Sequence, residues 1–107
     1  MVSLEELEKT TSALIAARRA LAEAKEQVIT CKKALIDRDC KQILQGLDGK
    51  NQAERDAQLR ILDASERAAL DEAEKRERAA TLELEICKDL RRHLENLISV
   101  ELMKEEA

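Results

Sequence analysis

The chain contains no proline and only two glycines, Gly46 and Gly49, which lie three residues apart near the middle of its 107 residues. Most β-turns need one of these residue types, so a sheet with several strand connections has too few turn residues to form here. Ala, Glu, Leu, Lys and Arg, which favour long helices, make up most of the chain. We therefore predict an all-α fold with one break. A length near 100 residues also predicts a single domain over residues 1–107.

The glycine pair divides the chain into two predicted helices. We place the first at about residues 3–45, a loop at 46–51 and the second at about 52–105. Because a short connection makes neighbouring helices antiparallel, these boundaries predict a long, coiled-coil-like helical hairpin. The pattern leaves open whether the first helix is continuous through residues 37–39.

The loop carries signals for both helix ends. Gly46 or Gly49 supplies the left-handed residue that commonly ends a helix. Asn51 and Glu54 have the spacing of a capping box in its Asn variant, in which the amide oxygen accepts from free backbone N–H groups and the glutamate reaches back. The second helix is therefore expected to begin directly after Asn51.

A heptad repeat runs along the first predicted helix, with large apolar residues every seven positions and small ones between them. The second predicted helix carries a less regular series of apolar residues, which Glu66, Arg76 and Glu83 interrupt. The first series is Leu7, Thr10, Leu14, Ala17, Leu21, Ala24, Val28, Cys31 and Leu35, and the second is Leu59, Leu62, Ala69, Ala73, Ala80, Cys87, Leu90, Leu94 and Leu97. These two series predict the seam along which the helices pack.

A second apolar stripe on the first helix lies too far around the helix for the same partner to cover it. The segment 94–103 near the end of the chain is also apolar. The predicted interface residues are Ile15, Ile29, Ile36 and Ile43 of the stripe, together with Leu94, Leu97, Ile98 and Leu102. Because exposed apolar surface of this extent favours association, we predict a homo-oligomer, a dimer or higher, most simply two hairpins in a four-helix bundle.

Arg18, Lys25 and Lys32 form a basic row beside the isoleucine stripe, again every seven residues. Such a row usually makes ion pairs between subunits, and the expected partners are carboxylates such as Glu66, Glu72 or Glu74. The alternative is a basic row that lines a pocket between subunits and holds an anionic ligand.

The loop offers a second location for an anion. Lys50, Asn51 and Arg55 lie at a predicted helix N-terminus, where free N–H groups and the helix dipole favour negative charge. The ordinary interpretation is a turn and a cap, because the motif lacks the glycine and the hydroxyl residue of a phosphate-binding P-loop.

Composition argues against several classes of function. A net charge of -4 with interspersed signs disfavours direct binding to duplex DNA, and the lack of aromatic residues excludes stacking of bases on rings. The only histidine, His93, has Leu90 three residues before it, where a di-iron helical bundle would need glutamate. We find no nucleophile motif. We therefore expect no enzyme, no metal and no cofactor.

The cysteines and the N-terminus bear on the cellular compartment. Cys31, Cys40 and Cys87 are odd in number and lack the spacing of a zinc site, so we expect free thiols packed as small apolar residues. The acidic N-terminus has no apolar signal segment, and no uncharged run is long enough to cross a bilayer. The expectation is a cytoplasmic protein without membrane contact.

Residues 49–59 carry the pattern Gly-Lys-Asn-x-x-x-Arg-x-x-x-Leu, followed by a helix rich in Ala, Glu and Leu. This segment resembles one found in the middle of small helical proteins of bacteriophages and prophages. The resemblance implies a phage origin and action in the cytoplasm of the bacterial host. The family brings no established activity or catalytic residues, so none are assigned from it.

Together these observations predict a non-enzymatic binding protein of phage type. It is expected to be an oligomeric helical hairpin that captures or blocks a host or phage protein, for example in counter-defence. One alternative is a sponge that sequesters an anionic nucleotide signal in pockets between subunits, with Lys50, Asn51, Arg55, Arg18, Lys25 and Lys32 as ligands. A second alternative is an accessory to phage DNA recombination or packaging that acts through protein contacts.

Overall fold

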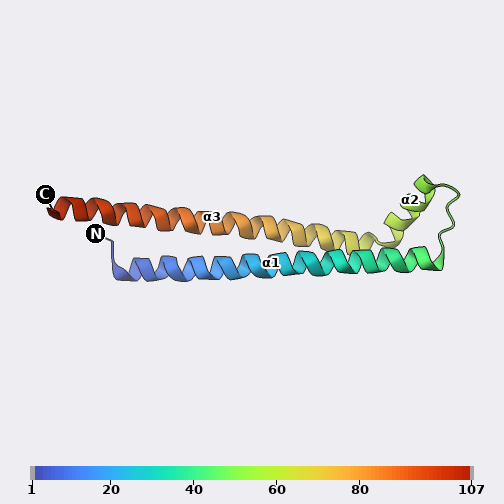
Figure 1. Cartoon of the computed structure of the whole chain (residues 1–107), viewed down its shortest axis with the longest axis horizontal. Helices are drawn as coiled ribbons and strands as arrows, with labels where there is room; N and C mark the ends of the chain where they lie inside the picture. Colours follow the sequence, from blue (N-terminus) through green and yellow to red (C-terminus); the bar gives the residue numbers. More distant parts are fainter. Residues whose placement is uncertain (1, 107) are drawn as a thin grey trace. The chain divides into compact units, whose positions relative to one another are not determined.

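The computed structural model describes residues 2–106, and this part of the chain contains three helices and no strand. Helix α1 spans Leu4–Gln45, α2 spans Gln52–Leu62 and α3 spans Ala64–Glu106 (Figure 1). The prediction of an all-α fold is confirmed, with a long helix packed against another. Helix α1 is continuous through residues 37–39, which answers the question that the sequence left open.

The two helix ends at the loop form as their residues predict. Gly46 has a φ of 94°, which is the left-handed region, and its N–H donates to the Ile43 carbonyl at 3.1 Å. Asn51 caps α2, because its Oδ1 accepts from the Glu54 N–H at 2.9 Å. The Glu54 carboxylate reaches back one residue further than in a standard capping box and accepts from the Lys50 N–H at 2.7 Å.

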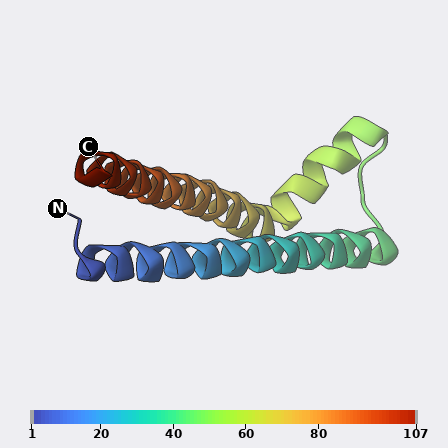
Figure 2. The same ribbon diagram turned by 60° about the vertical axis from the view of Figure 1, so that its left-hand side comes forward.

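The prediction of one helix over about 52–105 is wrong, because the helix is broken at Asp63. Asp63 has φ -103° and ψ 13°, and it is the C-terminal cap of α2. The Asp63 N–H donates to the Leu59 carbonyl at 2.9 Å, and the Asp63 carbonyl accepts from the backbone N–H of Arg67 at 3.0 Å. Figure 2 shows α2 leaving the line of the first turns of α3, and Asp63 is the residue between the two helices. Aspartate is a poor residue for a helix interior, since its side chain competes for nearby polar groups.

The described residues fall into two compact units, which we describe separately. Unit 1 combines the start of α1 with the C-terminal part of α3, that is, residues up to 23 and from 78. Unit 2 is the segment 24–77, which contains the rest of α1, all of α2 and the start of α3. The expectation of one domain over residues 1–107 stays a prediction.

Unit 1 is an antiparallel helix pair with a small core. Ala17 of α1 packs with Leu84 and Cys87 of α3, and Leu14 and Leu21 lie against this cluster. Near the start of α1, the Val2 N–H donates to a carboxylate oxygen of Glu101 at 3.1 Å. Since early residues of α1 meet late residues of α3, the antiparallel order expected of a hairpin holds within this unit.

Unit 2 repeats the arrangement with its own cluster. Val28 and Cys31 of α1 pack with Ala73 of α3, and Leu70 lies against them. Further along α1, the Arg38 guanidinium donates to the Leu62 carbonyl at 3.4 Å. The first predicted seam, which contains Val28 and Cys31, is therefore confirmed.

The predicted seam of the second helix is partly wrong. Leu90 and Leu97 are exposed, and the core instead contains Leu70 and Leu84, which the prediction omitted. Ala69, also predicted in the seam, is exposed. The predicted series included mainly apolar residues. The true seam follows the seven-residue spacing from Leu84 to Arg91, a polar residue that is half-buried, and a search for apolar residues passes over it.

Within residues 2–106, no helix combines the length and the apolar character that crossing a bilayer requires.

Candidate functional site

The isoleucine face is an exposed apolar surface of α1 in unit 2. It consists of Ile29, Ile36 and Ile43, whose exposed fractions are 53%, 60% and 57%. Their spacing of seven residues keeps them on one side of the helix, away from the seam residues Val28 and Cys31, which are buried. In unit 1, the predicted interface residue Ile15 is 45% exposed. These four residues are therefore exposed in a single chain.

The basic row beside the isoleucine face is also exposed. In unit 2 it contributes Lys25 and Lys32, and neither makes an ion pair with another residue in 2–106. Of the predicted carboxylate partners, Glu66 already pairs with Arg38 at 3.8 Å and Glu72 with Arg76 at 3.6 Å. The third, Glu74, has no ion pair within the described chain and lies half-buried on α3. Arg18 lies on α1 in unit 1, where it is likewise exposed.

The C-terminal interface residues divide into two pairs in unit 1. Leu94 and Ile98 are half-buried, whereas Leu97 is 39% and Leu102 54% exposed. The second pair therefore offers more of its apolar surface to a partner than the first. Substitution of the first pair would disturb the helix packing as well as any binding.

The polar groups at the start of α2 are largely satisfied by the chain itself. The capping side chains of Asn51 and Glu54 accept from backbone N–H groups there. Gln58 Oε1 accepts from the N–H groups of Asp48 and Gly49 at 3.0 and 3.2 Å. The Glu54 carboxylate thus already lies at the helix N-terminus, where an anion would bind.

The predicted anion ligands of unit 2 do not come together in one pocket. Arg55 lies in a small hollow with Ile43 and donates to the Gly49 carbonyl at 3.4 Å. Lys32 comes eleven residues before Ile43 on the same helix, which is about 16 Å at 1.5 Å per residue. No single small anion reaches both residues within one copy. The nucleotide alternative stays a prediction about pockets between copies.

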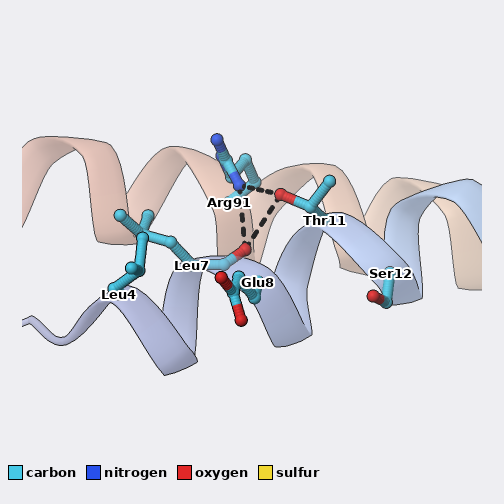
Figure 3. Close-up of a pocket in the computed structure, with 6 residues that line it drawn as sticks. All are labelled: Leu4, Leu7, Glu8, Thr11, Ser12 and Arg91. Atoms are coloured by element: carbon cyan, nitrogen blue, oxygen red, sulfur yellow. Dashed lines mark hydrogen bonds between the residues drawn. The ribbon is translucent and has the colours of Figure 1, made fainter.

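An open pocket of about 500 Å³ lies at the start of α1 in unit 1 (Figure 3). Arg91 reaches into it from α3, and its Nη1 donates to the Leu7 carbonyl at 3.2 Å and to Thr11 Oγ1 at 2.6 Å. Its Nε also pairs with Glu95 at 3.2 Å. Thr10 Oγ1 is a further acceptor, at 3.3 Å. Because this guanidinium already has four acceptors and Glu8 adds a negative charge to the same pocket, Arg91 positions the helices and is poorly placed to bind an anion.

A buried pair of carboxyl groups lies at the junction of α2 and α3 in unit 2. Asp63 is fully buried, with 0% exposure, and Asp39 of α1 is half-buried and lies within hydrogen-bonding reach of it. Arg67 Nε donates to Asp63 Oδ1 at 2.6 Å. The remaining oxygens, Asp39 Oδ1 and Asp63 Oδ2, are buried and meet no donor among the described residues when both groups are ionised. Sequence reasoning missed this pair, because the chain has 23 acidic residues and no sequence pattern distinguishes these two from the others.

The two carboxyl groups have opposite pKa shifts. Burial, together with the neighbouring Asp63, raises the pKa of Asp39 to about 6. Burial also acts to raise the pKa of Asp63, but hydrogen bonds from Arg67 and Asp39 outweigh it and hold that pKa below the usual value. Asp39 is therefore the group of the pair that keeps a proton as the pH rises.

The cysteines are free, and two of them are packed as predicted. Cys31 and Cys87 are buried, whereas Cys40 is exposed. Burial, together with the nearby Glu83 carboxylate, raises the pKa of the Cys87 thiol. This shift makes Cys87 a poor nucleophile near neutral pH. In the described part of the chain, no three His, Cys, Asp or Glu residues are grouped as a metal site would need.

Comparisons with protein-family models, with curated proteins and with solved structures found no match to this chain.

Proposed function

We propose that this chain is a non-enzymatic binding protein that self-associates along the isoleucine face of α1 and then captures another protein. The observation that carries the proposal is the isoleucine face itself. Ile29, Ile36 and Ile43 are each more than half exposed at heptad spacing, on the side of α1 away from the seam. A heptad of β-branched residues is typical of a helix–helix interface.

The occupant of the isoleucine face is a second copy of the chain. Fully burying an isoleucine contributes about 1.5–3 kcal/mol, so covering three that are half exposed favours association substantially. The charges support a like partner, because Lys25 and Lys32 beside this face and Glu74 on α3 all lack ion pairs within the described chain. Two copies can pair these opposite charges across the contact. Closed two-fold symmetry is the commonest arrangement for such a self-complementary surface.

As an oligomer, the chain presents the apolar C-terminal end of α3 to a further partner. Leu97 and Leu102 would make that contact, since they are the more exposed residues of the predicted C-terminal interface. The similarity of residues 49–59 to small phage and prophage proteins supports a host or phage protein as this partner, in the cytoplasm of a bacterium.

Self-association is tested by charging the isoleucine face. We expect the double variant Ile29→Lys, Ile36→Lys to sediment as a monomer while the parent chain sediments as an oligomer. Both changed residues lie on the exposed side of α1, so the helical signal in circular dichroism should remain. Sedimentation velocity over a range of concentrations measures the difference.

Ile61→Lys is the matched control, because Ile61 is also an exposed isoleucine, at 76%, but lies on α2 outside the isoleucine face. It should leave the oligomer unchanged. A parent chain that stays monomeric, or a double variant that assembles as well as the Ile61→Lys control, would contradict the proposal.

A further inference from the structure

The junction between α2 and α3 rests on a polar cluster inside unit 2. Asp63 has no exposed surface, and its backbone makes the two hydrogen bonds that join the end of α2 to the start of α3. Asp39 of α1 lies within hydrogen-bonding reach of the Asp63 side chain, and each residue has one buried carboxyl oxygen without a donor among the described residues. The carboxyl pair thus connects the junction directly to the helix that it packs against.

We propose that Asp39 and Asp63 share one proton, and that this proton holds the α2–α3 junction against α1. When the pair loses the proton, the junction is released from α1. Two facing ionised carboxylates would leave Asp39 Oδ1 and Asp63 Oδ2 buried without a donor. One proton between the two groups supplies that donor. It also reduces their combined charge from -2 to -1, which Arg67 balances.

The other charged groups around the pair do not replace the proton. From α1, Arg38 donates to the Leu62 carbonyl of α2 and pairs with Glu66 of α3. Glu66 adds negative charge near Asp39, which favours keeping the proton. The surrounding charged groups are Arg38 on α1, and Glu66, Arg67 and Asp71 on α3. Arg67 is the cation among them that contacts Asp63 directly.

The direction of the pH effect follows from the proton balance. Burial and Asp63 raise the pKa of Asp39 to about 6 from an ordinary value of 3.8, so the folded chain holds a proton that the unfolded chain has released between these values. The stability that this proton contributes is complete below the ordinary pKa and is lost as the pH rises through about 6. Asp63, whose pKa is lowered, acts in the opposite direction and only toward lower pH.

Backbone amide hydrogen exchange tests the proposal in the parent chain. After correction for the chemical exchange rate, amides at the end of α2 and the start of α3 should open about tenfold more at about pH 7.5 than at about pH 5. The variant Asp39→Asn should abolish this change, because its amide donates to Asp63 without carrying a charge. Asp37→Asn is the matched control, since Asp37 is an exposed aspartate on the same helix, and it should behave like the parent.

Exchange that is independent of pH in the parent chain, or equally pH-dependent in Asp39→Asn, would overturn the proposal. If Asp39→Asn fails to fold, carboxyl NMR of the parent chain provides the answer. Asp39 should then titrate near 6, and titration of Asp39 near its ordinary value of 3.8 would overturn the shared proton.

Discussion

Asp63 combines several structural roles in unit 2. Its side chain is fully buried, it ends α2, and it takes both a proton-sharing partner and a guanidinium partner. A buried carboxylate without such partners would be strongly unfavourable. The break in the helix and the burial of the carboxyl group therefore occur at the same residue. There the side chain of Asp63 takes the place of an apolar seam residue.

Leucines on α3 differ sharply in their expected contribution to stability. Leu84→Ala should lower the free energy of unfolding by about 2–3 kcal/mol, because Leu84 is 8% exposed in the core of unit 1. Leu90→Ala, at a residue that is 54% exposed, should lower it by less than about 1 kcal/mol. Urea unfolding followed by circular dichroism measures both. Equal losses, or a larger loss at Leu90, would show that the register of α3 is the one predicted from apolar residues alone.

The helices were largely predictable from local signals, and the register of α3 was not. Glycine conformation and capping residues act locally, so the glycine pair predicted the C-terminal end of α1, and Asn51 predicted the start of α2. The regular seam of α1 likewise predicted its buried face. The break at Asp63 and the pair with Asp39 depend on residues 24 positions apart, which no local pattern connects. The exposed isoleucines of the candidate site were predictable from the sequence. They repeat every seven residues, as the seam residues do, but lie on a different side of the helix.

The C-terminal end of α3 is the element to which we assign partner capture. The double variant Leu97→Glu, Leu102→Glu should lose the captured protein in a pull-down from bacterial lysate while keeping its helical circular dichroism signal. Both side chains are exposed, so charging them should not disturb the core of unit 1. Leu82→Glu, at a leucine of the same helix that is 63% exposed, is the matched control and should retain capture. Equal capture by the double variant and this control would contradict the assignment.

The balance of buried and exposed apolar residues over the described chain favours association. The buried apolar residues are six, and none is larger than leucine. Fourteen large apolar residues are exposed, including the three of the isoleucine face. A chain with no aromatic residues cannot enlarge its core through a few bulky rings. Covering exposed apolar surface with a second copy is therefore the most direct way to add to the stability of each copy.

Native mass spectrometry of the chain purified gently from a bacterial host tests the central claim most directly, because it gives the number of copies and the mass of any retained ligand together. We predict a dimer or larger oligomer whose mass is that of the protein alone. A monomer would contradict self-association along the isoleucine face. An oligomer that reproducibly carries a mass of nucleotide size would instead favour the sponge alternative, with Lys50, Arg55 and the basic row as its ligands.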